Sequence, residues 1–334
     1  MHVFITGVAG FLGSNLADSL LKKGYKVSGC DSLVGGELEN VNPKVKFSRV
    51  ECENLEKMTN IMKGVQIVVH AAAYAHEGLS NFSPKSIVSN NIVGSTSVFT
   101  AAIKNKVKRI VYCSSMARYG KIKPPFEEHN KPIPVDPYGI SKLAAEQILE
   151  NLSSTFGFEY NIAVPHNIIG PKQKFDDPYR NVVSIMANMI LQNKSPIIYG
   201  DGMQKRSFSD VDDCIFCIEK MMFDPKVKSQ VINIGPDENY ITINELYELI
   251  SNKMQFNKPP VYVEDRPNEV KFSYCSAEKA RKILKYKTSV TLDNSIQKTI
   301  DYIESKGPRK FKYDDYEIEI KNKLTPKTWI KKMF

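Results

Sequence analysis

The sequence has no apolar run that approaches the roughly 20 residues a membrane-spanning helix needs, so it predicts no membrane span. The N-terminus also lacks a basic segment followed by a cleavage site, because its first residues already resemble a buried strand. We therefore expect a cytoplasmic protein.

Cysteine is sparse and scattered, with six residues in 334, which argues against a disulfide-stapled secreted domain. Only Cys214 and Cys217 have the C-x-x-C spacing. They fall in a helical pattern without a second Cys or His pair. We expect two ordinary buried thiols and no metal site, with redox or metal chemistry as the alternative.

Acidic residues are outnumbered, and the net charge is +9. The lysines are spread along the chain and become denser near the C-terminus, without a basic stripe interleaved with aromatic residues. This pattern favours a lysine-rich solvated surface over nucleic-acid binding. Part of the positive charge can serve an anionic substrate.

Strand patterns alternate with helix patterns through the first half of the chain. The expected strands are 3–6, 25–30, 45–50, 66–70, 109–114 and 159–164, and the expected helices are 11–23, 55–63, 84–105 and 137–156. Such alternation predicts a doubly wound parallel sheet with helices on both faces, an α/β fold of the Rossmann type.

The rhythm breaks after about residue 165, where loops lengthen and prolines cluster. We assign residues 1–165 to the sheet domain and 166–334 to a smaller α/β lobe with a basic C-terminal tail. A strand near 230–235 is expected to join the first domain. The helices expected in the smaller lobe are 243–254, 277–284 and 292–304.

A glycine-rich turn follows the first strand, with Gly7, Gly10 and Gly13 spaced G-x-x-G-x-x-G before a helix. In this context the backbone can approach a pyrophosphate, and the helix presents its first amides to it. Asp31 ends the second strand, where a carboxylate accepts both ribose hydroxyls and repels a 2′-phosphate. The first domain is therefore predicted to bind NAD rather than NADP.

The segment after residue 135 carries a second motif, in which Tyr138 and Lys142 share one helical face. A tyrosine with a pKa near 10 is a poor base, and a nearby lysine favours its phenolate. Ser114 and Ser115 end the fifth strand, at the sheet edge where ligands bind. Glycine turn, serine and Tyr/Lys pair together predict general base catalysis beside NAD.

This combination resembles the extended short-chain dehydrogenase/reductase family, in its NAD-dependent epimerase/dehydratase branch, over nearly the whole chain. It is most similar to UDP-sugar 4-epimerases. The resemblance implies a catalytic triad of Ser115, Tyr138 and Lys142. The further cofactor contacts that it implies are Phe11, Leu12, Ala71, Ala72, Ala73, Asn91, Ser114 and Pro165. The implied substrate contacts are Ser115, Asn167, Asn181, Tyr199, Arg206, Arg266 and Ser273.

In that family two arginines hold the diphosphate of the substrate, and in this chain they would be Arg206 and Arg266. Arg266 begins the motif Arg-Pro-x-Glu, which ends at Glu269. The chain departs from the family's pattern at Val164, where an arginine is usual. It departs again at Glu51 and Cys52, where an aspartate usually contacts adenine. His70, His76 and His166 are expected to have no catalytic role, because the Tyr/Lys pair already supplies the base.

The two residues that follow Ser115 indicate the reaction. In dehydratases and decarboxylases of this family, acidic residues occupy these positions. Here they are Met116 and Ala117, so 4-epimerisation of a UDP-hexose through a 4-keto sugar is the expected outcome. A UDP-uronic acid is the alternative substrate, since Lys172, Lys174 and Arg180 can meet a C6 carboxylate. A dehydratase or decarboxylase of the same family, or a non-catalytic NAD-binding sensor, would also be compatible with the fold. A homodimer through helices 84–105 and 137–156 is implied by analogy.

Ser273 generates a prediction about the sugar. A bulky tyrosine at this place restricts the pocket in related UDP-galactose 4-epimerases, whereas a small residue leaves room for a 2-acetamido group. Ser273→Tyr is expected to abolish turnover of UDP-GlcNAc and UDP-GalNAc while sparing UDP-glucose and UDP-galactose, as measured by NMR of the products. Equal loss on both pairs would contradict this role of Ser273.

Overall fold

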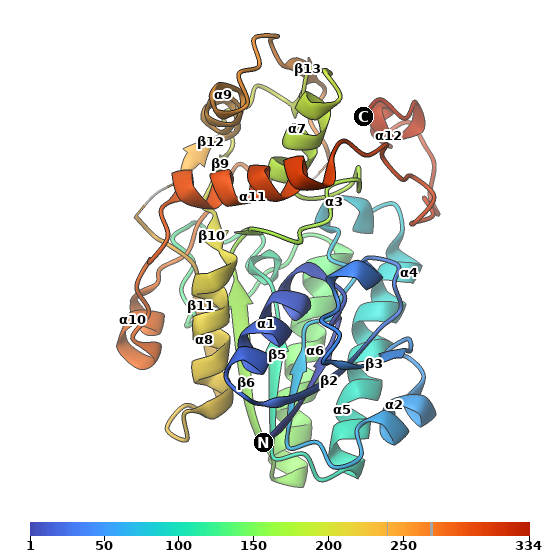
Figure 1. Cartoon of the computed structure of the whole chain (residues 1–334), viewed down its shortest axis with the longest axis vertical. Helices are drawn as coiled ribbons and strands as arrows, with labels where there is room; N and C mark the ends of the chain where they lie inside the picture. Colours follow the sequence, from blue (N-terminus) through green and yellow to red (C-terminus); the bar gives the residue numbers. More distant parts are fainter. Residues whose placement is uncertain (239, 268–269) are drawn as a thin grey trace.

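The computed structural model describes residues 1–238, 240–267 and 270–334 (Figure 1). Its centre is a sheet of seven parallel strands in the order β11-β6-β5-β4-β1-β2-β3. The strands are β1 (His2–Thr6), β2 (Lys26–Asp31), β3 (Lys46–Arg49), β4 (Ile67–His70), β5 (Arg109–Cys113), β6 (Glu159–Pro165) and β11 (Gln230–Ile234). The order reverses between β1 and β4, which is where doubly wound sheets bind ligands.

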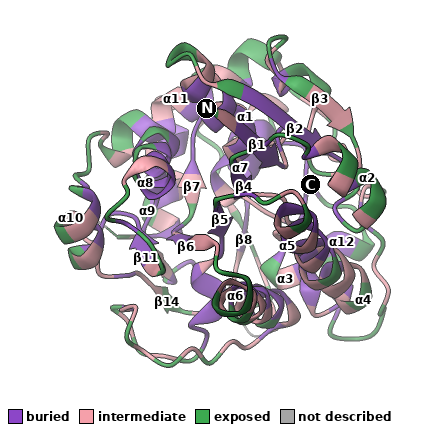
Figure 2. Ribbon diagram, turned by 90° about the horizontal axis from the view of Figure 1, so that it is seen from below, coloured by how far each residue is buried: buried purple, intermediate pink, exposed green. Residues whose placement is uncertain are grey.

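Helices cover both faces of this sheet, as the sequence predicts. One face carries α1 (Phe11–Lys22), α8 (Val211–Phe223) and α10 (Glu278–Leu284). The other carries α2 (Leu55–Ile61), α5 (Gly94–Lys104) and α6 (Pro137–Phe156). Successive residues of β1 alternate between the two cores, with Val3 and Ile5 on the α1 side and Phe4 on the α5 side. In Figure 2 the buried strands lie between the helical layers.

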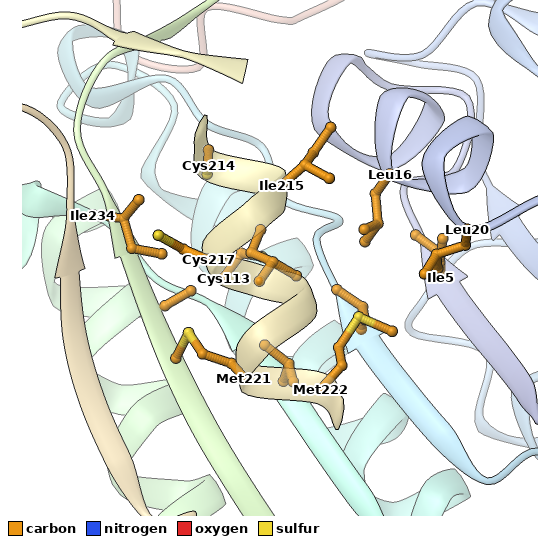
Figure 3. Packing of buried hydrophobic residues seen from close by; sticks show 14 of the residues in the cluster. Ile5, Leu16, Leu20, Cys113, Cys214, Ile215, Cys217, Met221, Met222 and Ile234 are labelled. Atoms are coloured by element: carbon orange, nitrogen blue, oxygen red, sulfur yellow. The ribbon is translucent and has the colours of Figure 1, made fainter. Parts of the chain in front are cut away.

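Helix α8 places Cys214 and Cys217 in the first of these cores, beside Ile215, Met221 and Cys113 (Figure 3). Both cysteines are free and buried. Burial raises the pKa of the Cys217 thiol to about 12, which keeps it protonated and unreactive at neutral pH. The C-x-x-C pair therefore consists of two buried core thiols.

The long helix expected over 84–105 is interrupted. It consists of α4 (Pro84–Val88), a π-helical segment (Ser89–Val93) and α5. Within the π segment the Asn91 side chain accepts a hydrogen bond from the Tyr74 amide at 2.9 Å. The wider turn holds this side chain against the loop after β4, a use of π segments that is common near functional sites.

The smaller lobe is built on α7 (Val182–Leu191), α9 (Ile243–Lys253) and α11 (Leu292–Lys306). Helix α7 was not predicted from the sequence, because its nearly continuous apolar run lacks the amphipathic pattern of a surface helix. Strands of two or three residues complete the lobe: β7 (Ile168–Ile169), β8 (Ile197–Tyr199), β9 (Lys205–Arg206), β10 (Ser209–Asp210), β12 (Ile241–Thr242), β13 (Val261–Val263) and β14 (Phe272–Ser273).

The chain returns to the sheet after it has entered the smaller lobe. Strand β11 pairs with β6 at the sheet edge, and α8 packs beneath it. The helix expected at 277–284 forms as α10, but it packs with the sheet rather than with the lobe, since Ala280 and Leu284 belong to the α8 core. None of the described helices has both the length and the apolarity needed to cross a membrane.

Arg109 joins β5, β6 and α8 and carries a stability prediction. Its buried guanidinium bonds Glu159 and the carbonyl groups of Met221, Met222 and Asp224 at 2.6–3.1 Å. Arg109→Met removes all of these hydrogen bonds, although the Met221 carbonyl still accepts from Asn161 and the Asp224 carbonyl from the Val227 amide. The loss of the buried guanidinium is expected to cost about 3 kcal/mol of unfolding free energy in urea titrations. The exposed neighbour Lys108→Met is expected to change it by less than about 0.5 kcal/mol; a similar loss in both variants would contradict the assignment.

Candidate active site

The glycine turn lies at the carboxyl end of β1. Gly7 has a φ of +71°, a conformation that favours glycine, and its amide bonds the Cys30 carbonyl at 2.8 Å. A Cβ at Gly13 would lie only 2.2 Å from the Gly7 carbonyl oxygen. Helix α1 therefore starts in direct contact with the turn, and its first residues line a cleft.

A cleft extends from this turn across the ends of β2, β4 and β5. It contains every residue predicted for the cofactor except Asn91, together with the predicted triad. The predicted residues that line it are Gly7, Gly10, Phe11, Leu12, Gly13, Asp31, Ala71, Ala72, Ala73, Ser114, Ser115, Tyr138, Lys142 and Pro165. We call it the cofactor cleft.

Asp31 marks one end of the cofactor cleft and also supports the turn. Its carboxylate accepts hydrogen bonds from the amides of Ala9 at 3.1 Å and Leu33 at 2.8 Å. Burial raises the pKa of this carboxyl, and the two bonds lower it. A Cβ at Gly36 would lie 2.8 Å from either carboxylate oxygen, so only glycine fits beside the carboxylate. These features fit the ribose of NAD and disfavour a 2′-phosphate.

Asn91 is the predicted cofactor residue that does not line this cleft. Its amide nitrogen donates to the Tyr74 carbonyl and to the Ser141 hydroxyl, both at 3.2 Å. The neighbouring Asn90 lines the cleft instead. Asn91 therefore holds the Tyr74 loop against α6.

Tyr138 occupies the first turn of α6. The helix begins at Pro137, and the Asp136 carboxylate caps it by accepting from the Gly139 amide at 2.8 Å. Burial raises the pKa of Tyr138 to about 12, whereas a hydrogen bond with Ser115 and the charge of Arg180 lower it. The phenol is therefore protonated at neutral pH in the protein alone.

Lys142 lies one turn further along α6, with its ammonium nitrogen 6.0 Å from the centre of the Tyr138 ring. This nitrogen donates to the Cys113 carbonyl at 2.7 Å, and burial lowers the pKa of Lys142 to about 8. From the sequence, Lys142 was expected to be the cation that favours the phenolate. In the structure the charge of Arg180 lowers the Tyr138 pKa, and the Lys142 ammonium bonds the carbonyl at the end of β5. The role of Lys142 toward the phenolate stays a prediction.

A second cleft adjoins the first and lies mainly in the smaller lobe; we call it the substrate cleft. Its lining includes the predicted residues Asn167, Asn181, Tyr199, Arg206 and Arg266. The Arg266 guanidinium lies 4.7 Å from the centre of the Tyr199 ring. Asn181 precedes α7, and its buried side-chain nitrogen has no hydrogen-bond partner among the described residues. Two guanidinium groups, a helix N-terminus and a buried amide donor suit a diphosphate.

Ser273 is the predicted substrate residue that neither cleft reaches in the described chain. It lies on β14 opposite Arg206 of β9, and its hydroxyl is 3.4 Å from Nε2 of His166. That Ser273 leaves room for a 2-acetamido group of the sugar stays a prediction. Glu269, the end of the arginine motif, lies outside the described residues.

The three histidines considered as catalytic groups, His70, His76 and His166, are all buried. His70 is held between the hydroxyl groups of Thr6 and Ser95 at 2.7 and 2.8 Å, and burial lowers its pKa to about 3. The pKa of His166 also falls to about 3 through burial and the charge of Arg206. His76 pairs with the buried Asp177 at 2.8 Å. His70 and His166 are thus held neutral at neutral pH.

Two further charged residues belong to the site: Glu77, which was not predicted from the sequence, and Arg180, which was named only as a candidate partner of a C6 carboxylate. Glu77, on the short helix α3 (Glu77–Ser80), and Arg180 both line both clefts. They act in opposite directions on the pKa of Tyr138, which Arg180 lowers and Glu77 raises. Glu77 follows the carboxyl end of β4, a position where charged residues often serve a ligand, and this was the available signal.

Comparison with known proteins adds independent findings. Residues 3–235 match the family described as NAD dependent epimerase/dehydratase family. The chain is 31% identical over 309 residues to a putative UDP-glucose 4-epimerase of Methanocaldococcus jannaschii, covering 91% of this chain and 98% of that protein.

Solved structures show the same likeness. A Thermotoga maritima UDP-glucose 4-epimerase crystallised with UDP-glucose is 30% identical, with a TM-score of 0.87 over 92% of this chain and 99% of that one. A UDP-N-acetylglucosamine 4-epimerase of Methanobrevibacter ruminantium is 28% identical, with a TM-score of 0.85 over 91% and 98%.

The close contact at Gly13 generates a prediction about the cofactor. In Gly13→Ala the new methyl group collides with the Gly7 carbonyl, so the turn must open and the amides move away from the pyrophosphate position. NAD affinity is expected to fall at least about tenfold in equilibrium dialysis, the loss of roughly one charge-assisted hydrogen bond. Unchanged NAD affinity in a folded variant would contradict this geometry.

Proposed function

The chain belongs to the NAD dependent epimerase/dehydratase family, and from that premise we propose that it is a 4-epimerase of a UDP-hexose. The family and the NAD cofactor predicted from the sequence are thereby confirmed. The pairs proposed as substrates are UDP-glucose with UDP-galactose and UDP-GlcNAc with UDP-GalNAc. The observation that carries the proposal is that the cofactor and substrate clefts meet beside the Ser/Tyr/Lys set.

The meeting point is defined by residues that the two clefts share: Ala75, Glu77, Asn167, Ile168, Arg180 and Asn181. A dinucleotide seated on the glycine turn would occupy the cofactor cleft, whose lining includes Tyr138. A sugar diphosphate held by Arg206 and Arg266 extends toward the same place from the other side. The reacting carbon of the sugar then lies between them.

The chain's own residues are assigned the following roles. When bound, NAD supplies the acceptor and donor of the hydride that interconverts the 4-hydroxyl sugar and its 4-keto form. Tyr138 takes the proton of the sugar O4 and returns it, and Ser115 holds that oxygen through its hydroxyl. Arg180 favours the phenolate, and the buried ammonium of Lys142 adds positive charge beneath the cofactor cleft.

Epimerisation is favoured over dehydration by the residues after Ser115. Met116 and Ala117 are buried, carry no transferable proton, and lie outside the described lining of both clefts. With no acid or base there, the simplest course for the keto sugar is to turn and receive the hydride on its other face.

Arg180 favours a second candidate substrate, a UDP-uronic acid. Of the three cations expected to meet a C6 carboxylate, Lys172 is paired with Asp18 and Lys174 with Asp315, each at 2.5 Å. Arg180 instead lines both clefts near Tyr138. UDP-glucuronate therefore belongs in the substrate panel.

The homodimer and the cytoplasmic location stay predictions. Two half-exposed apolar side chains support the dimer: Val93 in the π segment is 50% exposed, and Ile140 on α6 is 51% exposed. These helices are the ones expected to form a shared bundle between two copies of the chain.

Tyr138→Phe tests the proposed base. With NAD present, UDP-glucose, UDP-galactose, their N-acetylated counterparts and UDP-glucuronate are incubated with the protein, and products are separated by NMR. Turnover is expected to fall roughly 10²–10⁴-fold in the variant, because only the proton-transferring hydroxyl is lost, while NAD stays bound. Tyr25→Phe, at a tyrosine stacked on Phe223 away from both clefts, serves as the control. Full activity of the Tyr138 variant would refute the role.

A further inference from the structure

The basic C-terminal tail is docked on the protein along its length. Residues 308–334, which we call the C-terminal strap, follow α11 and end in the short helix α12 (Lys327–Ile330) (Figure 1). The strap lies beyond residues 3–235, which match the family, so the family assignment gives it no role.

One set of contacts ties the strap to the sheet domain. The Glu319 carboxylate accepts from the amides of Lys85 and Ser86 at the start of α4, at 2.9 and 2.8 Å. The Ile320 amide donates to the Phe82 carbonyl at 2.8 Å, and the Trp329 ring packs edge-on against Phe82.

A second set of contacts joins the strap to the smaller lobe, at the loop that precedes α7. The Lys312 amide bonds the Asp176 carbonyl at 2.8 Å, and its ammonium pairs with the buried Asp176 carboxylate at 2.9 Å. Asp315 pairs with Lys174, and Trp329 packs against Tyr179. The strap therefore bridges the two halves of the molecule beside the substrate cleft.

The end of the strap contacts the substrate cleft itself. The Thr328 hydroxyl bonds the Tyr199 hydroxyl at 2.6 Å, and Phe334 lines the cleft. Tyr199 in turn carries the Arg266 guanidinium over its ring. A Cβ at Gly78 would lie 3.4 Å from Nη1 of Arg266 and 3.7 Å from Cη2 of Trp329, so Arg266 and the strap pack on one surface.

We propose that the strap completes the nucleotide site and that Thr328 is a positioning residue in it. The inference rests on the proposed function. Thr328 fixes the ring of Tyr199, and that ring fixes Arg266 in the direction of a nucleoside diphosphate. Because Tyr199 and Arg266 are ordered before the ligand arrives, less conformational freedom is lost on binding. The strap therefore governs affinity for the nucleotide and leaves the proton-transfer step at Tyr138 unaffected.

The test compares Thr328→Val with Thr328→Ser, which keeps the hydroxyl, and with Lys323→Ala at an exposed strap residue. UDP alone is the probe in calorimetric titration, and KM and kcat are measured for UDP-glucose. The valine variant is expected to weaken UDP binding and raise KM by about fivefold, the loss of one hydrogen bond, with kcat within about twofold. Thr328→Ser and Lys323→Ala are expected to match the unmodified protein.

Tyr199→Phe removes the same hydrogen bond without altering the strap. If Thr328→Val unfolds, the UDP affinity of Tyr199→Phe tests the proposal in its place. Adding Thr328→Val to Tyr199→Phe is expected to cause no further loss of UDP affinity. Unchanged UDP affinity in both single variants overturns the proposal, as does a loss that appears in kcat rather than KM. If the unmodified protein binds UDP but epimerises no sugar, the proposed function fails and the UDP affinities still decide the role of Thr328.

Discussion

The close contact between α1 and β1 is the constraint on which the rest of the site depends. Helix α1 starts so near the strand that only hydrogen fits at Gly13, and this places the first residues of the helix in the lining of the cofactor cleft. Asp31 stabilises the same turn, because its carboxylate accepts a hydrogen bond from the Ala9 amide at 3.1 Å. Since the strand order reverses beside β1, the turn, the end of β4 and the start of α6 meet at one edge of the sheet.

Electrostatics at that edge explain why both ligand clefts are needed for chemistry. Burial holds the Tyr138 phenol protonated in the protein alone, with a pKa of about 12. Glu77 and Arg180, which line both clefts, shift that pKa in opposite directions. A base of this kind becomes effective only when its surroundings gain positive charge, as an oxidised nicotinamide would supply in the cofactor cleft. The smaller lobe and the strap bring the second ligand to the position where this occurs.

The sequence predicted the sheet, the glycine turn, Asp31 and the Ser/Tyr/Lys set because each depends on local spacing within one strand, turn or helix. Helix α6 begins and ends as expected, at Pro137 and Phe156. The smaller lobe was harder to predict, since α7 is a nearly continuous apolar run and the strands of the lobe are two or three residues long. The positions of Arg180, Glu77 and the strap depend on contacts between segments far apart in the chain, such as Thr328 with Tyr199, and spacing along the sequence does not reveal these.

The most direct test of the proposed epimerisation follows hydrogen at C4 of the sugar. The protein is incubated with NAD and UDP-galactose in D₂O, and the UDP-glucose formed is examined by NMR. Because the same hydride leaves C4 and returns to its other face, the product is predicted to keep protium at C4. Deuterium at C4, or no epimer from any UDP-sugar, would contradict the proposal.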